Sequence, residues 1–157
     1  MLTRCRKLTR ETFRRREELD LVELLRRDGR VATSLVALQS GAVVGHILFT
    51  ALPLEIDGVP VRAASLAPTA IRPDLQRLGI GSRLVADGLR LLRKSAWSAV
   101  IAHGNSNFYA RFGFSAELAR KLSPPLSKYS VMARELVPGA LAGNRGLVRY
   151  PAAFNFA

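Results

Sequence analysis

The chain has 157 residues, the size of one domain, and 48% of them are hydrophobic, which is enough for a core. A single cysteine, Cys5, excludes an internal disulfide and argues against a secreted, disulfide-stabilised scaffold. No apolar run reaches the roughly 18 residues of a membrane span, and the charged start lacks the apolar core of a signal peptide. We therefore expect one domain over residues 1–157, located in the cytoplasm and without a membrane partner.

The net charge of +12 makes nucleic acid or another acidic molecule a candidate partner. Half of this excess lies in the first sixteen residues, where Glu11 is the one acidic side chain. Apart from Phe13 this segment has no aromatic residue on which a base could stack. We therefore favour a solvated basic arm over residues 1–13 and regard nucleic-acid binding as the weaker interpretation. The basic residues of the segment are Arg4, Arg6, Lys7, Arg10, Arg14, Arg15 and Arg16.

Residues 14–27 carry an apolar stripe, with acidic side chains toward the front and basic ones at the back, which predicts a helix stabilised by its dipole. Asp28-Gly29 ends this helix. Three strands rich in β-branched and apolar residues follow, and Asp57-Gly58 has the composition of a two-residue hairpin turn. We place these strands at residues 31–38, 42–54 and 59–71 and expect them to be antiparallel.

The stretch from Ile71 to Leu84 joins the third strand to a helix through a basic, glycine-rich turn. Gly79 and Gly81 allow the backbone to approach a ligand closely, and Ser82 can cap the helix, whose first N–H groups attract phosphate. A P-loop is excluded because its Gly-x-x-x-x-Gly-Lys run is absent, and a dinucleotide fingerprint would need glycine or alanine at position 84. The turn therefore predicts an anion site of another kind.

Apolar residues at helical spacing continue this helix through Leu92. Residues 96–102 then form a short apolar segment, which predicts a buried strand parallel to the strand before the helix. Strand, loop, helix and strand together make a right-handed crossover unit.

Beyond this unit, residues 106–112 predict a short helix ending at Gly113, and residues 130–136 predict a last strand. Residues 138–157 are punctuated by glycine and proline, so we expect this tail to pack on the body without forming a new element. The aromatic side chains that would pack there are Tyr150, Phe154 and Phe156.

Two of these segments resemble one known family. Gln76-x-x-Gly79-x-Gly81, after a strand and a proline, resembles the acetyl-CoA loop of the GNAT superfamily of N-acetyltransferases. About thirty residues on, Asn107-Phe108-Tyr109-Ala110-Arg111-Phe112-Gly113-Phe114 resembles the family's Tyr-x-x-x-Gly-Phe segment. The family usually opens with a strand and a longer first helix. Here either that first strand is missing or the native N-terminus lies upstream of Met1.

The resemblance implies an α/β (α+β) fold. Its sheet would be mixed and mostly antiparallel, flanked by helices, with a central parallel strand pair splayed around the cofactor. We expect the splay where residues 69–71 face residues 100–102. The implied cofactor is acetyl-CoA (coenzyme A), and its implied contacts are Thr69, Ala70, Ile71, Gln76, Arg77, Leu78, Gly79, Ile80, Gly81, Ser82 and Asn105.

The implied reaction transfers the acetyl group to a primary amine by direct attack, with backbone N–H groups near Ala70 and Ile71 binding the oxyanion. Tyr109 is the candidate acid that protonates the leaving thiolate; the alternative is a tyrosine that only packs. The general base stays open between Glu55, His46 and a water chain. His46 is more simply a satisfied core histidine.

The partner is an amine acceptor that the sequence does not identify. Residues 52–59 and 116–129 are the candidate walls of its pocket, and a homodimer is left open. We expect no metal, because two histidines and one cysteine offer no ligand spacing. Two other functions remain as alternatives: a catalytically inactive module that binds CoA or acyl-CoA and regulates, and a basic nucleic-acid-binding protein.

Overall fold

A computed structural model describes residues 24, 26–123 and 130–149. The predicted basic arm, most of the helix at residues 14–27, part of the predicted acceptor pocket (124–129) and the three aromatic residues of the tail lie outside the described residues. Within the described part, no helix is both long and apolar enough to cross a membrane.

The described elements follow the predicted order up to α4, with strand, loop, helix and strand in the middle of the chain. They are β1 (Val31–Gln39), β2 (Ala42–Ile56), β3 (Val59–Ile71), the 3-10 helix η1 (Pro73–Leu75), α3 (Ile80–Lys94), β4 (Ala99–His103), α4 (Ser106–Ala110), α5 (Ala116–Ala119), β5 (Leu122–Ser123), β6 (Val131–Glu135) and β7 (Gly146–Val148).

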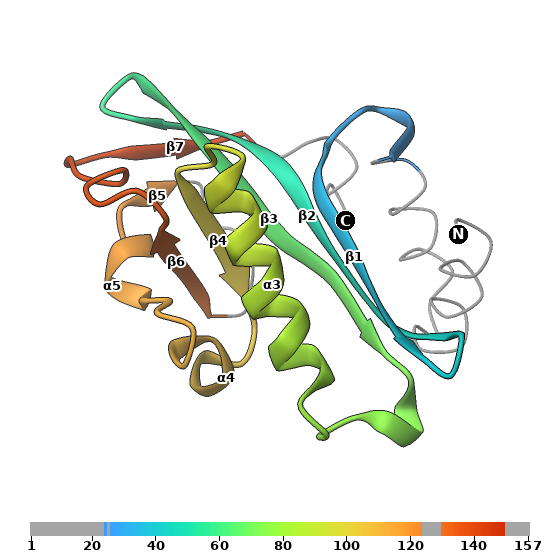
Figure 1. Ribbon diagram of the computed structural model, residues 1–157. Helices are drawn as coiled ribbons and strands as arrows, with labels where there is room; N and C mark the ends of the chain where they lie inside the picture. The colour runs from blue at the N-terminus through green and yellow to red at the C-terminus, as the bar shows by residue number, and fades with distance from the viewer. Residues whose placement is uncertain (1–23, 25, 124–129, 150–157) are drawn as a thin grey trace.

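The strands form one mixed sheet in the order β5-β7-β2-β3-β4-β6, with β1 also paired to β2. The pairs β3–β4 and β5–β7 are parallel and the others antiparallel. Helix α3 lies across one face of the sheet, in contact with β1, β2 and β3, and α4 and α5 lie on the β6 side (Figure 1). The predicted fold class, a mixed sheet around a central parallel pair and flanked by helices, is confirmed.

The β2–β3 hairpin turns at the predicted dipeptide. Asp57 and Gly58 both have positive φ, 49° and 81°, which is the backbone twist that suits two-residue hairpins. The Asp57 carboxylate also accepts hydrogen bonds from the amides of Asn144 (3.0 Å) and Arg145 (2.9 Å). The hairpin therefore holds the start of β7 in place.

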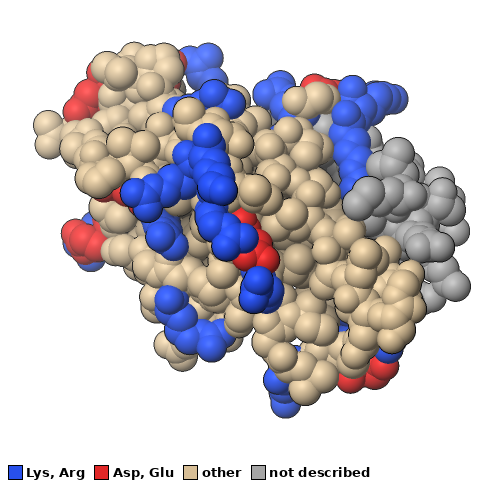
Figure 2. All heavy atoms as spheres, in the orientation of Figure 1, with Lys and Arg blue, Asp and Glu red and all other residues tan. Residues whose placement is uncertain are grey.

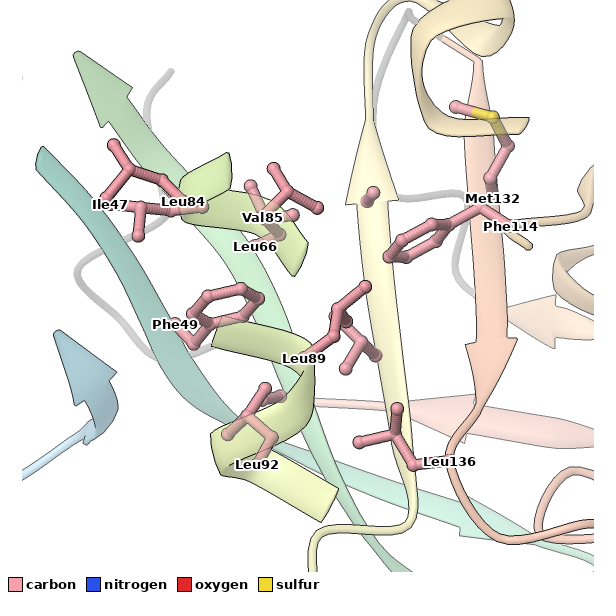
Figure 3. Packing of buried hydrophobic residues seen from close by; sticks show 13 residues of the cluster. Ile47, Phe49, Leu66, Leu84, Val85, Leu89, Leu92, Phe114, Met132 and Leu136 are labelled. Carbon is pink, nitrogen blue, oxygen red and sulfur yellow. The ribbon is translucent and has the colours of Figure 1, made fainter. Parts of the chain in front are cut away.

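The core is divided between the two faces of the sheet. On the α3 face, Phe49, Leu89 and Leu92 pack with the apolar residues of β3, β4 and β6 (Figure 3). Gly88 is required there, because a Cβ at this position would lie 2.2 Å from Cε2 of Phe49. On the opposite face a second cluster includes Leu54 and Ile101. Both faces of the sheet are therefore covered by protein where β2 and β3 contribute residues to these two clusters.

The tail differs from its prediction. Residues 146–148 form a strand, β7, which pairs with β2 (Leu54↔Val148) and with β5. The sequence did not indicate it because three residues are too few for a strand pattern, and their pairing depends on partners far away in the chain. Residues 116–119 and 122–123, for which no helix or strand was predicted, form α5 and β5.

Candidate active site

The parallel strands β3 and β4 pair only along part of their length. Their register runs from Ala63↔Ala99 to Leu66↔Ala102, after which β3 continues to Ile71 without β4 beside it (Figure 1). The predicted splay of the two strands is found at residues 69–71 of β3, but these residues do not face residues 100–102, which pair with residues 64–66. A helical crossover fixes that two strands are parallel, but it does not fix their register.

A β-bulge lies at the point of divergence. Ile47 of β2 pairs with Thr69, but Phe49 pairs with Leu66, so β3 has one residue more than β2 between these pairs. The Thr50 hydroxyl donates to the carbonyl of Ala67 within the bulge (3.2 Å). Because of this extra residue, the alternation of β3 peptide groups between the β2 side and the β4 side changes phase at the bulge.

The consequence is seen at the end of β3, where the Arg72 amide donates to the Val44 carbonyl (2.8 Å). Because peptide groups alternate along a strand, those of Thr69 and Ile71 point to the side that β4 has left, and that of Ala70 points to β2. The Thr69 hydroxyl oxygen is also buried, with no partner among the described residues. This edge therefore presents polar groups that the described protein leaves unused.

The loop after β3 is braced from within. The Gln76 side chain donates to the Ile71 carbonyl (3.1 Å), and Arg72 forms an ion pair with Asp74 (2.6 Å). Arg77 has φ 65°, a conformation that residues other than glycine rarely adopt. Such strain concentrates at functional segments, and here it turns the chain directly into α3.

Helix α3 begins at Ile80, with Gly79 at the N-cap in the left-handed region (φ 87°). The predicted cap is therefore wrong, because Ser82 lies within the first turn and no side chain caps the helix. The Arg83 amide makes the first helical bond, to the Gly79 carbonyl (3.0 Å). The amides of Ile80, Gly81 and Ser82 have no hydrogen bond to any described residue, so they are available to an anion.

The two glycines of the loop, Gly79 and Gly81, differ in why a side chain is absent. Gly79 needs its positive φ, and a Cβ there would meet nothing within 4 Å. Gly81 has no such backbone requirement, and a Cβ would meet only Ile71, at 3.9 Å, so nothing inside the described protein explains this glycine. Gly45, in contrast, is explained from within, because its Cβ would lie 2.9 Å from the Ile71 side chain and 3.2 Å from that of Ile80.

Helix α4 completes the site on the β4 side. Asn105 caps it, its side-chain oxygen accepting from the amides of Asn107 (3.0 Å) and Phe108 (3.2 Å). Tyr109 packs edge-on against Phe108 and Phe114, and burial raises the pKa of its phenol. Its hydroxyl has no hydrogen bond to a described residue. The tyrosine is thus half-buried, held in the proton-bearing form and able to donate.

Arg111 is a site residue that the sequence reasoning missed. Its guanidinium donates to the Ser82 hydroxyl (3.2 Å) and lies over the rings of Phe108 (5.1 Å) and Phe112 (5.8 Å). It therefore fixes a positive charge beside the first turn of α3, where the unused amides lie. The available signal was its place two residues after Tyr109, at the C-terminal end of the same short helix.

The structure argues against both side chains that were candidates for the general base. Glu55 pairs with Pro60 beside the hairpin, about 26 Å along β2 from Ile47, and so lies at the other end of the sheet. His46 is buried and hydrogen-bonded to Ser34 (Nε2 to Oγ, 3.0 Å). Burial, and secondarily the charge of Arg26, lower the pKa of His46 to about 4. His46 is thus a core histidine, as the simpler interpretation expected, but it is not fully satisfied, because its Nδ1 atom is buried without a partner among the described residues.

His103 is the last residue of β4, one position past the final pair with β3. Its Nε2 atom is buried without a partner among the described residues, and burial lowers the pKa of the imidazole. Strand alternation places its side chain with that of Ile101, on the face opposite α3. No group of three or more metal-binding side chains occurs in the described ranges.

A braced loop, a helix start with unused amides and a diverging parallel strand pair define an acetyltransferase of the GNAT type. Residues 2–114 match the acetyltransferase (GNAT) family, and the chain belongs to it. Family membership confirms the fold, the acetyltransferase class and acetyl-CoA as the family's cofactor, as expected from the sequence.

The chain is 32% identical over 151 residues to the uncharacterised N-acetyltransferase YhbS of Escherichia coli (strain K12), covering 94% of this chain and 89% of that one. The crystal structure of YhbS from Escherichia coli in complex with CoA superposes with a TM-score of 0.86 at 30% identity, covering 98% and 86% of the two chains. A GNAT acetyltransferase from Brucella melitensis in complex with acetyl-CoA gives a TM-score of 0.78 at 30% identity, covering 98% and 91%.

Proposed function

We propose that this chain transfers the acetyl group of acetyl-CoA to a primary amine by direct attack, with both substrates bound at once. The observation that carries the proposal is the start of α3. Three amides without a described partner lie there beside Gly81, a glycine for which the described protein gives no internal reason. A bound diphosphate explains both, since its oxygens accept hydrogen bonds from the three amides and it occupies the space that a side chain would take.

The other predicted contacts fit the rest of the coenzyme. Acetyl-CoA supplies the acetyl group as a thioester. Thr69 offers a hydroxyl without a described partner. The N–H group of Ile71 faces outward along the open edge of β3, while its carbonyl accepts from Gln76. Gln76 braces the loop, Arg77 and Leu78 lead into the helix, and Asn105 fixes α4 beside the divergence.

In the proposed chemistry, the amine nitrogen attacks the thioester carbonyl, a C–N bond forms and the C–S bond breaks. The Ile71 amide stabilises the negative charge on the carbonyl oxygen, since the alternation of peptide groups turns that of Ala70 toward β2. The proton that the amine nitrogen loses passes to a water chain, since the structure places neither Glu55 nor His46 at the site. Tyr109 gives its phenolic proton to the departing sulfur. Its raised pKa keeps the proton on the phenol until then.

The physiological setting is part of the same proposal. We place the reaction in the cytoplasm, carried out by a single domain over residues 1–157, with an amine as the second substrate. Nothing in the described residues favours a purely regulatory module or a nucleic-acid-binding protein over the enzyme.

Two measurements on the wild-type chain test the proposal. Acetyl-CoA at a hundred times its Kd should stabilise the fold by about 2.7 kcal/mol, seen as a rise in Tm. Release of free thiol from acetyl-CoA should depend on an added primary amine from a panel of small amines, lysine peptides and peptide N-termini. No change in Tm at millimolar acetyl-CoA would contradict the proposal. Binding without thiol release across the panel would favour the regulatory module.

A further inference from the structure

His103 is positioned by the same turn that positions Tyr109. Its backbone pairs with Val131 of β6, and the next amide, that of Gly104, donates to the Ser130 carbonyl (3.1 Å). Gly104 then takes a φ of 115°, and the chain turns into α4, which carries Tyr109. The backbone of His103 is therefore held on the side toward β6, while the side toward β3 is open.

The open half of β3 lies close to His103. This histidine comes one residue after the last pair between the two strands, so it is level with Ala67 of β3. The outward-facing N–H groups of Thr69 and Ile71 come two and four residues later, about 7 and 13 Å along the strand. A histidine side chain and a short chain of waters span these distances. The imidazole is therefore within reach of an amine that attacks a thioester held at these N–H groups.

The side chains of Tyr109 and His103 belong to opposite faces of the sheet. Tyr109 packs against the core cluster of the α3 face. Strand alternation and pairing place His103 with Ile101 and Val131, which pack in the cluster of the other face. In acyl transfer the nitrogen and the sulfur occupy different positions on the tetrahedral carbon. A proton donor for the sulfur and a proton acceptor for the nitrogen are therefore needed on different sides of that carbon.

The surface charge favours an approach of the amine from the face of His103. Lys and Arg side chains cover much of the face that α3 presents, with few acidic ones (Figure 2). A primary amine is largely a cation in neutral water, so the α3 face repels it. The face opposite α3 is the remaining side from which it can reach the open half of β3.

The imidazole of His103 has a nitrogen to offer. Its Nε2 atom is buried without a partner among the described residues, which costs roughly 1–3 kcal/mol unless a ligand or a water meets it. Burial lowers the pKa of the ring, so the ring is neutral near pH 7. In the tautomer that carries its proton on Nδ1, the Nε2 lone pair is available to accept a proton.

His46 lies on the same face of the sheet but is less suited to accept a proton. Its Nε2 atom is hydrogen-bonded to the Ser34 hydroxyl (3.0 Å) and lies 3.5 Å from Nη2 of Arg26. The charge of Arg26 opposes a second positive charge on this ring, and it contributes to the lowered pKa of His46. For His103 burial is the cause, with no described cation contributing.

Glu135, the acidic residue of β6, is not placed to take the proton either. It shares the face of His103 but pairs with Ala99, at the other end of β4. Its carboxylate accepts hydrogen bonds from the amides of Gly139 (2.8 Å) and Leu141 (3.1 Å). This carboxylate therefore holds the chain after β6 in place.

We propose that His103 is the proton acceptor of the acetyl transfer, its Nε2 atom taking, through bound water, the proton that the amine nitrogen loses. The inference rests on the proposed function and names where the water chain ends. The C–N bond forms, the C–S bond breaks and Tyr109 protonates the sulfur. The imidazolium then returns its proton through solvent to the phenolate, so both residues regain their starting forms.

The test measures kcat of His103→Ala with acetyl-CoA and an amine that the wild type accepts, with and without added imidazole. We expect kcat to fall about a hundredfold and imidazole to recover at least about tenfold of this loss, because it restores a base in the vacated space. Pyrazole has nearly the same shape but is a far weaker base, so it should recover little. Recovery by both compounds alike, recovery by neither, or an unchanged kcat would overturn the proposal.

His46→Ala is the matched control, since it removes the other buried histidine of the same face. Its kcat should change less than about threefold, and imidazole should not raise it. His103→Gln covers the case in which His103→Ala does not fold, because glutamine fills more of the space but takes up no proton. It should show the same loss of kcat at unchanged acetyl-CoA affinity.

The same measurements separate this inference from the proposed function. If the wild type transfers the acetyl group to an amine and His103→Gln does so equally fast, the proton acceptor is not His103 and the proposed function stands. A wild-type chain that binds acetyl-CoA but releases thiol with no amine of the panel rejects both.

Discussion

The two halves of β3 differ in what surrounds them. From Ala63 to Leu66 the strand has β2 on one side and β4 on the other, with apolar clusters on both faces. From Thr69 to Ile71 it keeps β2 but has lost β4, and it leads into a strained loop and an uncapped helix. The first half satisfies its polar groups within the protein. The second half leaves polar groups without a partner in the described protein, so they are available to a ligand. One continuous strand thus passes from the core into a binding site.

Substitutions at two glycines of α3, Gly88 beside the core and Gly81 beside the proposed site, test this difference most directly. Gly88→Ala places a Cβ 2.2 Å from the fully buried Phe49 ring. We expect a loss of about 3 kcal/mol in the free energy of unfolding from overpacking, which outweighs the gain of roughly 1 kcal/mol in helix propensity. Urea unfolding measures it. Unchanged stability would mean that the core beneath α3 is looser than the closed half of the sheet requires.

The acid sensitivity of the fold is a second measure of the closed part of the sheet. Burial lowers the pKa of His46 from 6.5 to about 4, so between these values the unfolded chain binds a proton that the folded one does not. Stability is therefore complete above pH 6.5 and falls by roughly 3 kcal/mol as the pH approaches 4. Burial lowers the pKa of His103 in the same direction.

Unfolding titrations at pH 7.5 and 4.5 measure this loss before the depressed carboxyl pKa values of Asp57 and Asp74 contribute. Replacing the imidazole in His46→Gln should shrink the difference between the two pH values. A variant with the same difference as the wild type would show that His46 is not the group responsible.

At the open half, Tyr109→Phe tests the acid. We expect a loss of at least about a hundredfold in kcat with acetyl-CoA affinity nearly unchanged, because the ring packing is kept and only the proton donor is removed. Thiol release and isothermal titration separate the two quantities. Full turnover in this variant would return Tyr109 to the packing role and leave the thiolate to be protonated by solvent.

Gly81→Ala is the counterpart of Gly88→Ala on the same helix. Its Cβ would meet only Ile71, at 3.9 Å, so the fold should be unaffected or slightly more stable, while acetyl-CoA binding weakens about ten- to a hundredfold. Gly79→Ala does not separate the two effects as cleanly. Its φ of 87° makes the substitution costly for the fold as well. Tight acetyl-CoA binding by Gly81→Ala would contradict the proposed position of the diphosphate.

The smallest expected effect is spectroscopic. The chain has two histidines, so its imidazole NMR signals are few and readily assigned. On addition of acetyl-CoA the signals of His103, at the divergence of β3 and β4, should shift. Those of His46, held by Ser34, should move less. The reverse pattern would place the ligand nearer to His46 on β2 than to the divergence of β3 and β4.

Much of this architecture follows from local pattern alone. The bounds of β3, the Asp57-Gly58 turn, the helix after the glycine-rich loop and the Tyr109 segment were all predicted, because alternation, turn chemistry and helical spacing are written in neighbouring residues. The same segments carried the resemblance to the acetyltransferase family and hence its cofactor.

The tertiary structure decided the features that depend on contacts between residues far apart in the sequence. The register of β3 against β4, the bulge that turns the Thr69 and Ile71 peptide groups outward, the strand β7 and the contact of Arg111 with Ser82 have no local signal. The N-cap of α3 is Gly79 and not the predicted Ser82, because the backbone takes its left-handed turn at Gly79. Sequence neighbours specify which elements form, whereas register, strain and long-range contacts specify where the unused hydrogen-bonding groups are placed, and those groups make the site.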